Sequence, residues 1–78
     1  MHVVLYTRSG CGLCDRAREI LEAQRIRTPF ELEEIDIEGD DALELDYGLR
    51  VPVVTVDGVE RFEVEVDAAE LATLLDGS

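Results

Sequence analysis

Residues 3–14 read Val3-Val4-Leu5-Tyr6-Thr7-Arg8-Ser9-Gly10-Cys11-Gly12-Leu13-Cys14. The apolar, β-branched beginning of this segment is typical of a strand that is covered on both faces, and Arg8-Ser9-Gly10 interrupts it. The amphipathic residues that follow predict a helix from about Cys11 to Arg25. A C-x-x-C pair that opens a helix directly after a strand indicates thiol–disulfide exchange, because a helix N-terminus favours a thiolate.

The middle of the chain predicts a second strand and a short helix. The strand covers residues 30–37, and its apolar side chains change parity between Leu32 and Ile35. This strand therefore either carries a bulge or is covered on both faces. The segment Gly39-Asp40-Asp41 supplies a turn and an N-cap for a helix that ends near Tyr47.

The last third of the chain predicts a β-hairpin followed by a helix. Val53–Val56 is an apolar, β-branched strand, and Asp57-Gly58 is a two-residue hairpin signal. In the return strand, the side chains expected to point inward are Phe62, Val64 and Val66. Asp67 is expected to cap the final helix, residues 68–75. The inward stripe of that helix is Ala68, Leu71, Ala72, Leu74 and Leu75.

These elements follow the order β-α-β-α-β-β-α and predict an α/β fold in one domain, residues 1–78. The first two strands are joined through a helix and should be parallel, whereas the last two form an antiparallel hairpin. The sequence therefore predicts a mixed four-stranded sheet that is flanked by helices.

Composition limits the classes of protein to which the chain can belong. The chain is 46% hydrophobic and 33% charged, and no run approaches the roughly 20 apolar residues of a membrane-spanning helix. It begins without the basic and apolar segments of a secretory leader. Two cysteines at this spacing, with no others, fit a catalytic pair better than a secreted disulfide framework. We therefore expect a cytoplasmic monomer without membrane association.

Charge is distributed unevenly along the chain, whose net charge is −12. Residues 1–30 carry five arginines against three acids, whereas residues 31–78 carry two arginines against sixteen acids. The acidic excess argues against binding to nucleic acid and keeps a small protein soluble. The cysteines lie in the positive part, and a positive environment stabilises a thiolate.

Three motifs resemble the glutaredoxins of the thioredoxin superfamily. They are residues 5–14, Ile35-Asp36-Ile37, and Val51-Pro52-Val53-Val54 ahead of Asp57-Gly58. The resemblance covers nearly the whole chain and is greatest with the short glutaredoxin-like proteins. It implies a thioredoxin/glutaredoxin-like fold and thiol–disulfide oxidoreductase activity.

The resemblance also implies roles for individual residues. Cys11 would be the nucleophile and Cys14 the resolving cysteine. Arg8 matches a basic position of glutaredoxins and would favour the thiolate. Pro52 would be cis and face the cysteines, so that the backbone of Val51 could pair with an extended substrate segment.

Departures from the glutaredoxin pattern bear on the substrate. Gly12 and Leu13 stand between the cysteines in place of proline and tyrosine; Gly12 makes the turn more flexible, and Leu13 is either an apolar lip for substrate or ordinary core. The glycine pair that follows the hairpin in glutaredoxins is missing, although Asp67 keeps an acidic helix start. We therefore expect glutathione to be a poor co-substrate, and a protein disulfide or a reductase to be the preferred partner.

Two alternatives remain open at the level of sequence. The cysteines could be structural or bind metal, but with His2 the chain offers three soft ligands, short of the four that structural zinc uses. A metal or iron–sulfur cluster bridged between two chains through Cys11 is another arrangement. We expect no bound cofactor and no metal, and the competing function is a non-catalytic or metal-associated interaction domain.

Overall fold

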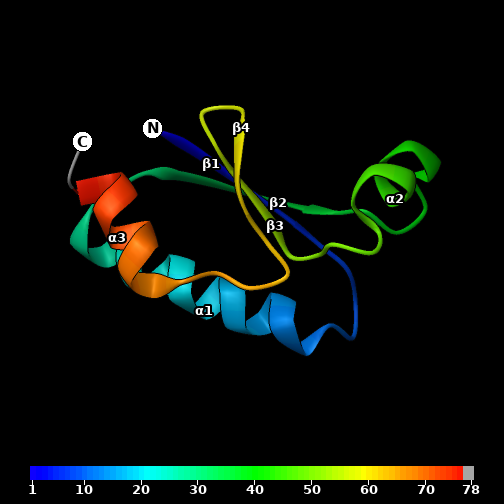
Figure 1. Ribbon diagram of the computed structural model, residues 1–78, viewed down its shortest axis with the longest axis horizontal. Coiled ribbons are helices and arrows are strands. Elements are labelled where there is room, and N and C mark those ends of the chain that lie inside the picture. Colours follow the sequence, from blue (N-terminus) through cyan, green and yellow to red (C-terminus); the bar gives the residue numbers. More distant parts are fainter. Residues whose placement is uncertain (77–78) are drawn as a thin grey trace.

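The computed structural model describes residues 1–76 and contains a four-stranded sheet with three helices (Figure 1). The strands are β1 (His2–Thr7), β2 (Glu31–Asp36), β3 (Val53–Val56) and β4 (Val59–Glu63). The helices are α1 (Gly12–Arg27), α2 (Asp41–Tyr47) and α3 (Ala68–Asp76). This order confirms the predicted β-α-β-α-β-β-α sequence of elements. Within the described residues, no helix combines the length and apolar character needed to cross a bilayer.

The strands lie in the order β2-β1-β3-β4, with β1 parallel to β2 and antiparallel to β3. β3 and β4 are also antiparallel, so the sheet is mixed, as predicted. The pairing of β1 with β2 runs without a register shift from His2–Glu31 to Thr7–Asp36. The change of parity in β2 is therefore not a bulge in this pairing. Leu32 and Ile35 point to opposite faces and are each half-buried, and the other residues of β2 are exposed, so neither face of this strand is fully covered.

Side chains of β1 alternate between two layers of the fold. Leu5 points into the main core, where α1 contributes Leu21 and α3 contributes Leu71, all three fully buried. Tyr6 has the opposite parity and stacks on Tyr47 of α2, with ring centroids 4.2 Å apart. α1 and α3 thus share one face of the sheet and lie together in Figure 1, whereas α2 packs on the other face.

The hairpin between β3 and β4 has the predicted two-residue turn. Asp57 and Gly58 both have positive φ angles, 51° and 85°, as a type I′ turn requires. The return strand is shorter than predicted, because β4 ends at Glu63. Phe62 and Val66 are buried as expected.

The prediction for Val64 was wrong, since its side chain is 43% exposed and its φ angle is 69°. The amide of Val64 donates to the carbonyl oxygens of Arg50 and Pro52, both at 2.9 Å, and this pairing turns the chain out of the strand. The prediction for Ala68 was also wrong, because this residue is exposed at the start of α3.

Replacement of Val64 by glycine should stabilise the protein. A β-branched residue at positive φ costs about 1–2 kcal/mol, and glycine removes this cost. Because glycine also makes the unfolded chain more flexible, roughly half of the gain is lost. We therefore expect a net increase of about 0.5–1 kcal/mol in the free energy of unfolding. Urea denaturation measures it. The matched control is Val59→Gly, a similarly exposed strand residue without positive φ, which should lower stability. A loss of stability in Val64→Gly would contradict the strain argument.

Candidate functional site

Cys11 and Cys14 form a disulfide whose Cα atoms are 5.2 Å apart. Cys11 is the N-cap of α1, with an extended backbone (φ −100°, ψ 106°), and its Sγ accepts a hydrogen bond of 3.1 Å from the amide of Cys14. Cys14 is fully buried, whereas Cys11 is partly exposed. A partner molecule can therefore reach the first sulfur more easily than the second.

The helix start places positive potential at the Cys11 sulfur. Amides of the first turn of a helix have no partner within the helix, and the helix dipole adds partial positive charge there. Asp15 would oppose a thiolate, but its carboxylate is paired with the Arg18 guanidinium at 2.9 Å. Arg18 also pairs with Glu34, and hydrogen bonds to Glu34 and then to Asp15 raise the pKa of Arg18 above its ordinary value.

The Arg8 side chain forms an ion pair and a hydrogen bond with residues of α2 and its C-cap. Its Nη2 lies 2.9 Å from the Glu44 carboxylate, and its Nη1 donates to the carbonyl oxygen of Gly48 at 3.3 Å. The guanidinium thus ties the loop before Cys11 to the C-terminal end of α2, and Glu44 offsets its charge. Sequence reasoning missed this contact, because Glu44 lies far away along the chain. The effect of Arg8 on the thiolate stays a prediction.

The Val51-Pro52 peptide bond is cis, as the resemblance implied, and Pro52 is fully buried. Val53, the next residue, pairs with Tyr6 near the end of β1. The Val51-Pro52 segment therefore lies at the same end of the sheet as the loop that leads to Cys11. Within residues 1–76, neither the N–H nor the C=O of Val51 forms a hydrogen bond to the protein, and the residue is half-buried.

Gly12 and Leu13 form the exposed first turn of α1. A Cβ at Gly12 would meet no other part of the protein within 4 Å, apart from its chain neighbours and the backbone of its own helix, so the space beside Gly12 is open. Leu13 is 42% exposed, which excludes the alternative that it is ordinary core. Its side chain is an apolar lip next to the cysteines.

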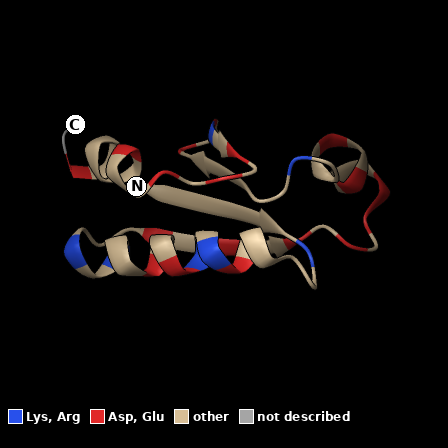
Figure 2. Ribbon diagram, turned by 60° about the horizontal axis from the view of Figure 1, so that its bottom comes forward, with Lys and Arg blue, Asp and Glu red and all other residues tan. Residues whose placement is uncertain are grey.

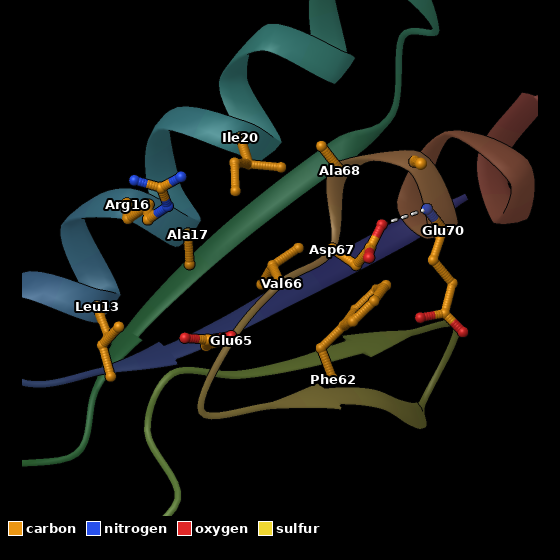
Figure 3. A pocket seen from close by; sticks show the side chains of 11 residues that line it. Leu13, Arg16, Ala17, Ile20, Phe62, Glu65, Val66, Asp67, Ala68 and Glu70 are labelled. Atoms are coloured by element: carbon orange, nitrogen blue, oxygen red, sulfur yellow. Dashed lines mark hydrogen bonds between the residues drawn. The ribbon is translucent and has the colours of Figure 1, made fainter.

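A groove of about 760 Å³ extends from Leu13 between α1 and the chain that leads from β4 into α3 (Figure 3). Its lining residues are Leu13, Arg16, Ala17, Ile20, Phe62, Glu65, Val66, Asp67, Ala68, Ala69 and Glu70. The sequence did not reveal this groove, because three separate segments build it. Ala68, which the sequence wrongly predicted to be buried, is one of the residues that line the groove.

His2 lies far from the cysteines. It begins β1, and Cys11 follows the other end of that six-residue strand, roughly 20 Å away at about 3.3 Å per residue. The imidazole lies 3.2 Å from the carboxylates of both Glu31 and Glu33, whose hydrogen bonds raise the pKa of His2. His2 therefore cannot complete a metal site with Cys11 and Cys14, and within residues 1–76 no three or more His, Cys, Asp or Glu side chains are arranged so that they could hold a metal ion.

The sheet order, the C-x-x-C pair at the start of α1 and the cis-proline before β3 together define a thioredoxin-fold protein. Within this class, the model of the Glutaredoxin-like domain (DUF836) family matches residues 2–76. The chain belongs to this glutaredoxin-like family.

Similar proteins agree with this assignment. An uncharacterised protein of Mycobacterium tuberculosis is 36% identical over a 74-residue alignment, which covers 88% of this chain and 76% of that protein. The X-ray structure of target protein XcR50 from X. campestris has a TM-score of 0.81 at 37% identity and covers 97% of each chain. Reduced Escherichia coli glutaredoxin has a TM-score of 0.68 at 27% identity over the full length of both chains.

Proposed function

We propose that this protein is a thiol–disulfide oxidoreductase that reduces protein disulfides through the Cys11/Cys14 dithiol. The observation that carries the proposal is the position of Cys11, partly exposed at the N-cap of α1, with a buried partner cysteine at disulfide distance. A solvent-accessible thiol stabilised as thiolate by helix amides is the group that attacks a disulfide.

The chemistry begins from the dithiol. The Cys11 thiolate attacks one sulfur of the substrate disulfide, a mixed disulfide forms, and the other substrate sulfur leaves as a thiolate that takes up a proton. Cys14 then loses its proton and attacks the Cys11 sulfur, which forms the intramolecular disulfide and releases the second substrate thiol. Two electrons pass from the dithiol to the substrate, and two protons accompany them.

Features around the cysteines support an extended polypeptide as the substrate. The N–H and C=O of Val51, which have no hydrogen-bond partner within residues 1–76, can add a strand-like segment by backbone hydrogen bonds, and Leu13 supplies an apolar contact. Glutathione is expected to be a weak co-substrate, because the glycine pair that glutaredoxins carry after the hairpin is missing and residues 31–78 are strongly acidic. A reductase is the expected electron donor, no cofactor is bound, and the protein acts as a cytoplasmic monomer.

Redox titration of the purified protein tests this function. We expect a reversible two-electron couple between dithiol and disulfide that is absent in Cys14→Ser. We also expect iodoacetamide to modify Cys11 of the reduced protein before Cys14, as mapped by mass spectrometry. Failure to form the intramolecular disulfide, or a coloured protein that holds a cluster through Cys11, would favour the metal-associated interaction domain instead.

A further inference from the structure

We propose that the groove between α1 and α3 binds a basic segment of the protein substrate, in which a Lys or Arg side chain lies next to an apolar one. This inference rests on the proposed function and adds the chemistry of the substrate. The groove begins at Leu13, two residues after Cys11, so a polypeptide whose cysteine reaches Cys11 can continue into it.

The groove offers an apolar contact surface along its length. The apolar side chains exposed along it are Leu13 of α1 and Ala68 and Ala69 of α3, and Ile20 is half-buried, whereas Ala17, Phe62 and Val66 are almost fully buried. Phe62 and Val66 belong to the buried core, and Ile20 packs against that core, so this surface is held rigidly. A rigid apolar surface suits an aliphatic side chain of the ligand.

The charged side chains of the groove favour a ligand of positive charge. Glu65, Asp67 and Glu70 supply three carboxylates, against the single guanidinium of Arg16. Asp67 is used as a helix cap, since its Oδ1 accepts a 2.9 Å hydrogen bond from the amide of Glu70. Within residues 1–76, neither Glu65 nor Glu70 forms an ion pair.

Figure 3 shows that both glutamates come from the wall opposite α1, at separate positions along the chain that leads from β4 into α3. Glu65 lies in the segment after β4, and its carboxylate is turned toward the Leu13 side, whereas Glu70 extends from the first turn of α3. Both side chains are exposed, so a ligand cation can reach them.

Net charge argues that the occupant is a basic partner and not a second copy of this chain. The chain carries −12, and two copies brought together at this acidic groove would repel each other. Figure 2 shows that α2 and the segment before it are acidic as well, so no part of α2 supplies a complementary surface. A segment with Lys or Arg has the complementary sign, and glutathione or an acidic segment does not.

Two short synthetic peptides test the proposal without relying on redox chemistry. Each peptide contains one leucine and one serine, and the serine stands where the substrate has its cysteine. Two further positions are lysine in one peptide and glutamate in the other. Binding to the oxidised ¹⁵N-labelled protein is measured by NMR titration. We expect the lysine peptide to bind roughly tenfold more tightly, with shifts at residues 13–20 and 65–70, because two partly exposed charge pairs of this kind form.

Charge-removing variants assign the preference to the groove. In Glu65→Gln/Glu70→Gln, the preference for lysine should fall to about twofold or less. The matched control, Asp41→Asn/Asp46→Asn, removes the same charge from α2 and should keep the full preference. Equal affinity for the two peptides, or equal loss of preference in both double variants, would overturn the proposal.

The same peptides with cysteine, oxidised to disulfide dimers, separate this proposal from the proposed function. If the serine peptides show the lysine preference but neither dimer is reduced, the groove assignment holds and the oxidoreductase function fails. If both dimers are reduced at the same rate and both serine peptides bind alike, the function holds and the groove assignment fails.

Discussion

Replacing Cys11 by serine is expected to lower disulfide reductase activity by on the order of a thousandfold or more. The nucleophile in this chemistry is the thiolate, and a serine hydroxyl at the helix start stays protonated near neutral pH. The 3.1 Å hydrogen bond from the amide of Cys14 would remain with a serine oxygen at the N-cap, so the fold should be unaffected. Reduction of a protein disulfide by the chemically reduced protein, followed as released thiol in a single turnover, measures the loss.

Cys14→Ser is the matched control, because it removes one sulfur from the same turn but leaves the nucleophile. This variant should attack the substrate and then stop as a mixed disulfide at Cys11, which mass spectrometry detects as an adduct that dithiothreitol reverses. Full activity in Cys11→Ser, or an adduct on Cys14 in that variant, would show that the roles of the two cysteines are exchanged.

Sequence alone predicted most of the architecture, because local patterns decide these elements. The run before Arg8 and the pair Asp57-Gly58 act through backbone preferences that need no distant partner, and both appear as predicted. Val64 shows where such patterns fail. Its alternation with Phe62 predicts an inward side chain, but hydrogen bonds to the backbone around Pro52 override this preference and turn the chain outward.

In the candidate site, too, features set by neighbouring residues could be predicted from the sequence, and features set by tertiary packing could not. The cysteines are neighbours in sequence, so the N-cap position of Cys11 follows from the local pattern. The ion pair of Arg8 with Glu44 depends on how α2 packs against the sheet, and no local signal reports it. The acidic groove depends on the contact of α1 with the segment after β4, so its charge could be described only after the chain was folded.

Replacing Leu21 by alanine should destabilise the protein more than any surface change. Leu21 is fully buried between α1 and the sheet, and truncation of such a leucine costs about 2–5 kcal/mol, through lost burial and the cavity that remains. A domain of 78 residues has a free energy of unfolding of about 4–12 kcal/mol at 0.05–0.15 kcal/mol per residue, so this single change removes a large share of it. Urea denaturation followed by circular dichroism should show a much lower midpoint with a similar slope.

Leu45→Ala is the matched control, since it makes the same truncation on α2 at a side chain that is 87% exposed, and its effect should stay within about 0.5 kcal/mol. Leu21 lies on α1, the helix that Cys11 caps and that carries the groove residues Ala17 and Ile20. Below the new midpoint, where Leu21→Ala is still folded, α1 should keep its place and the Cys11/Cys14 couple should be unchanged. Equal losses of stability in the two variants would mean that α1 is not anchored through Leu21, and the rigid support proposed for the groove would be lost with it.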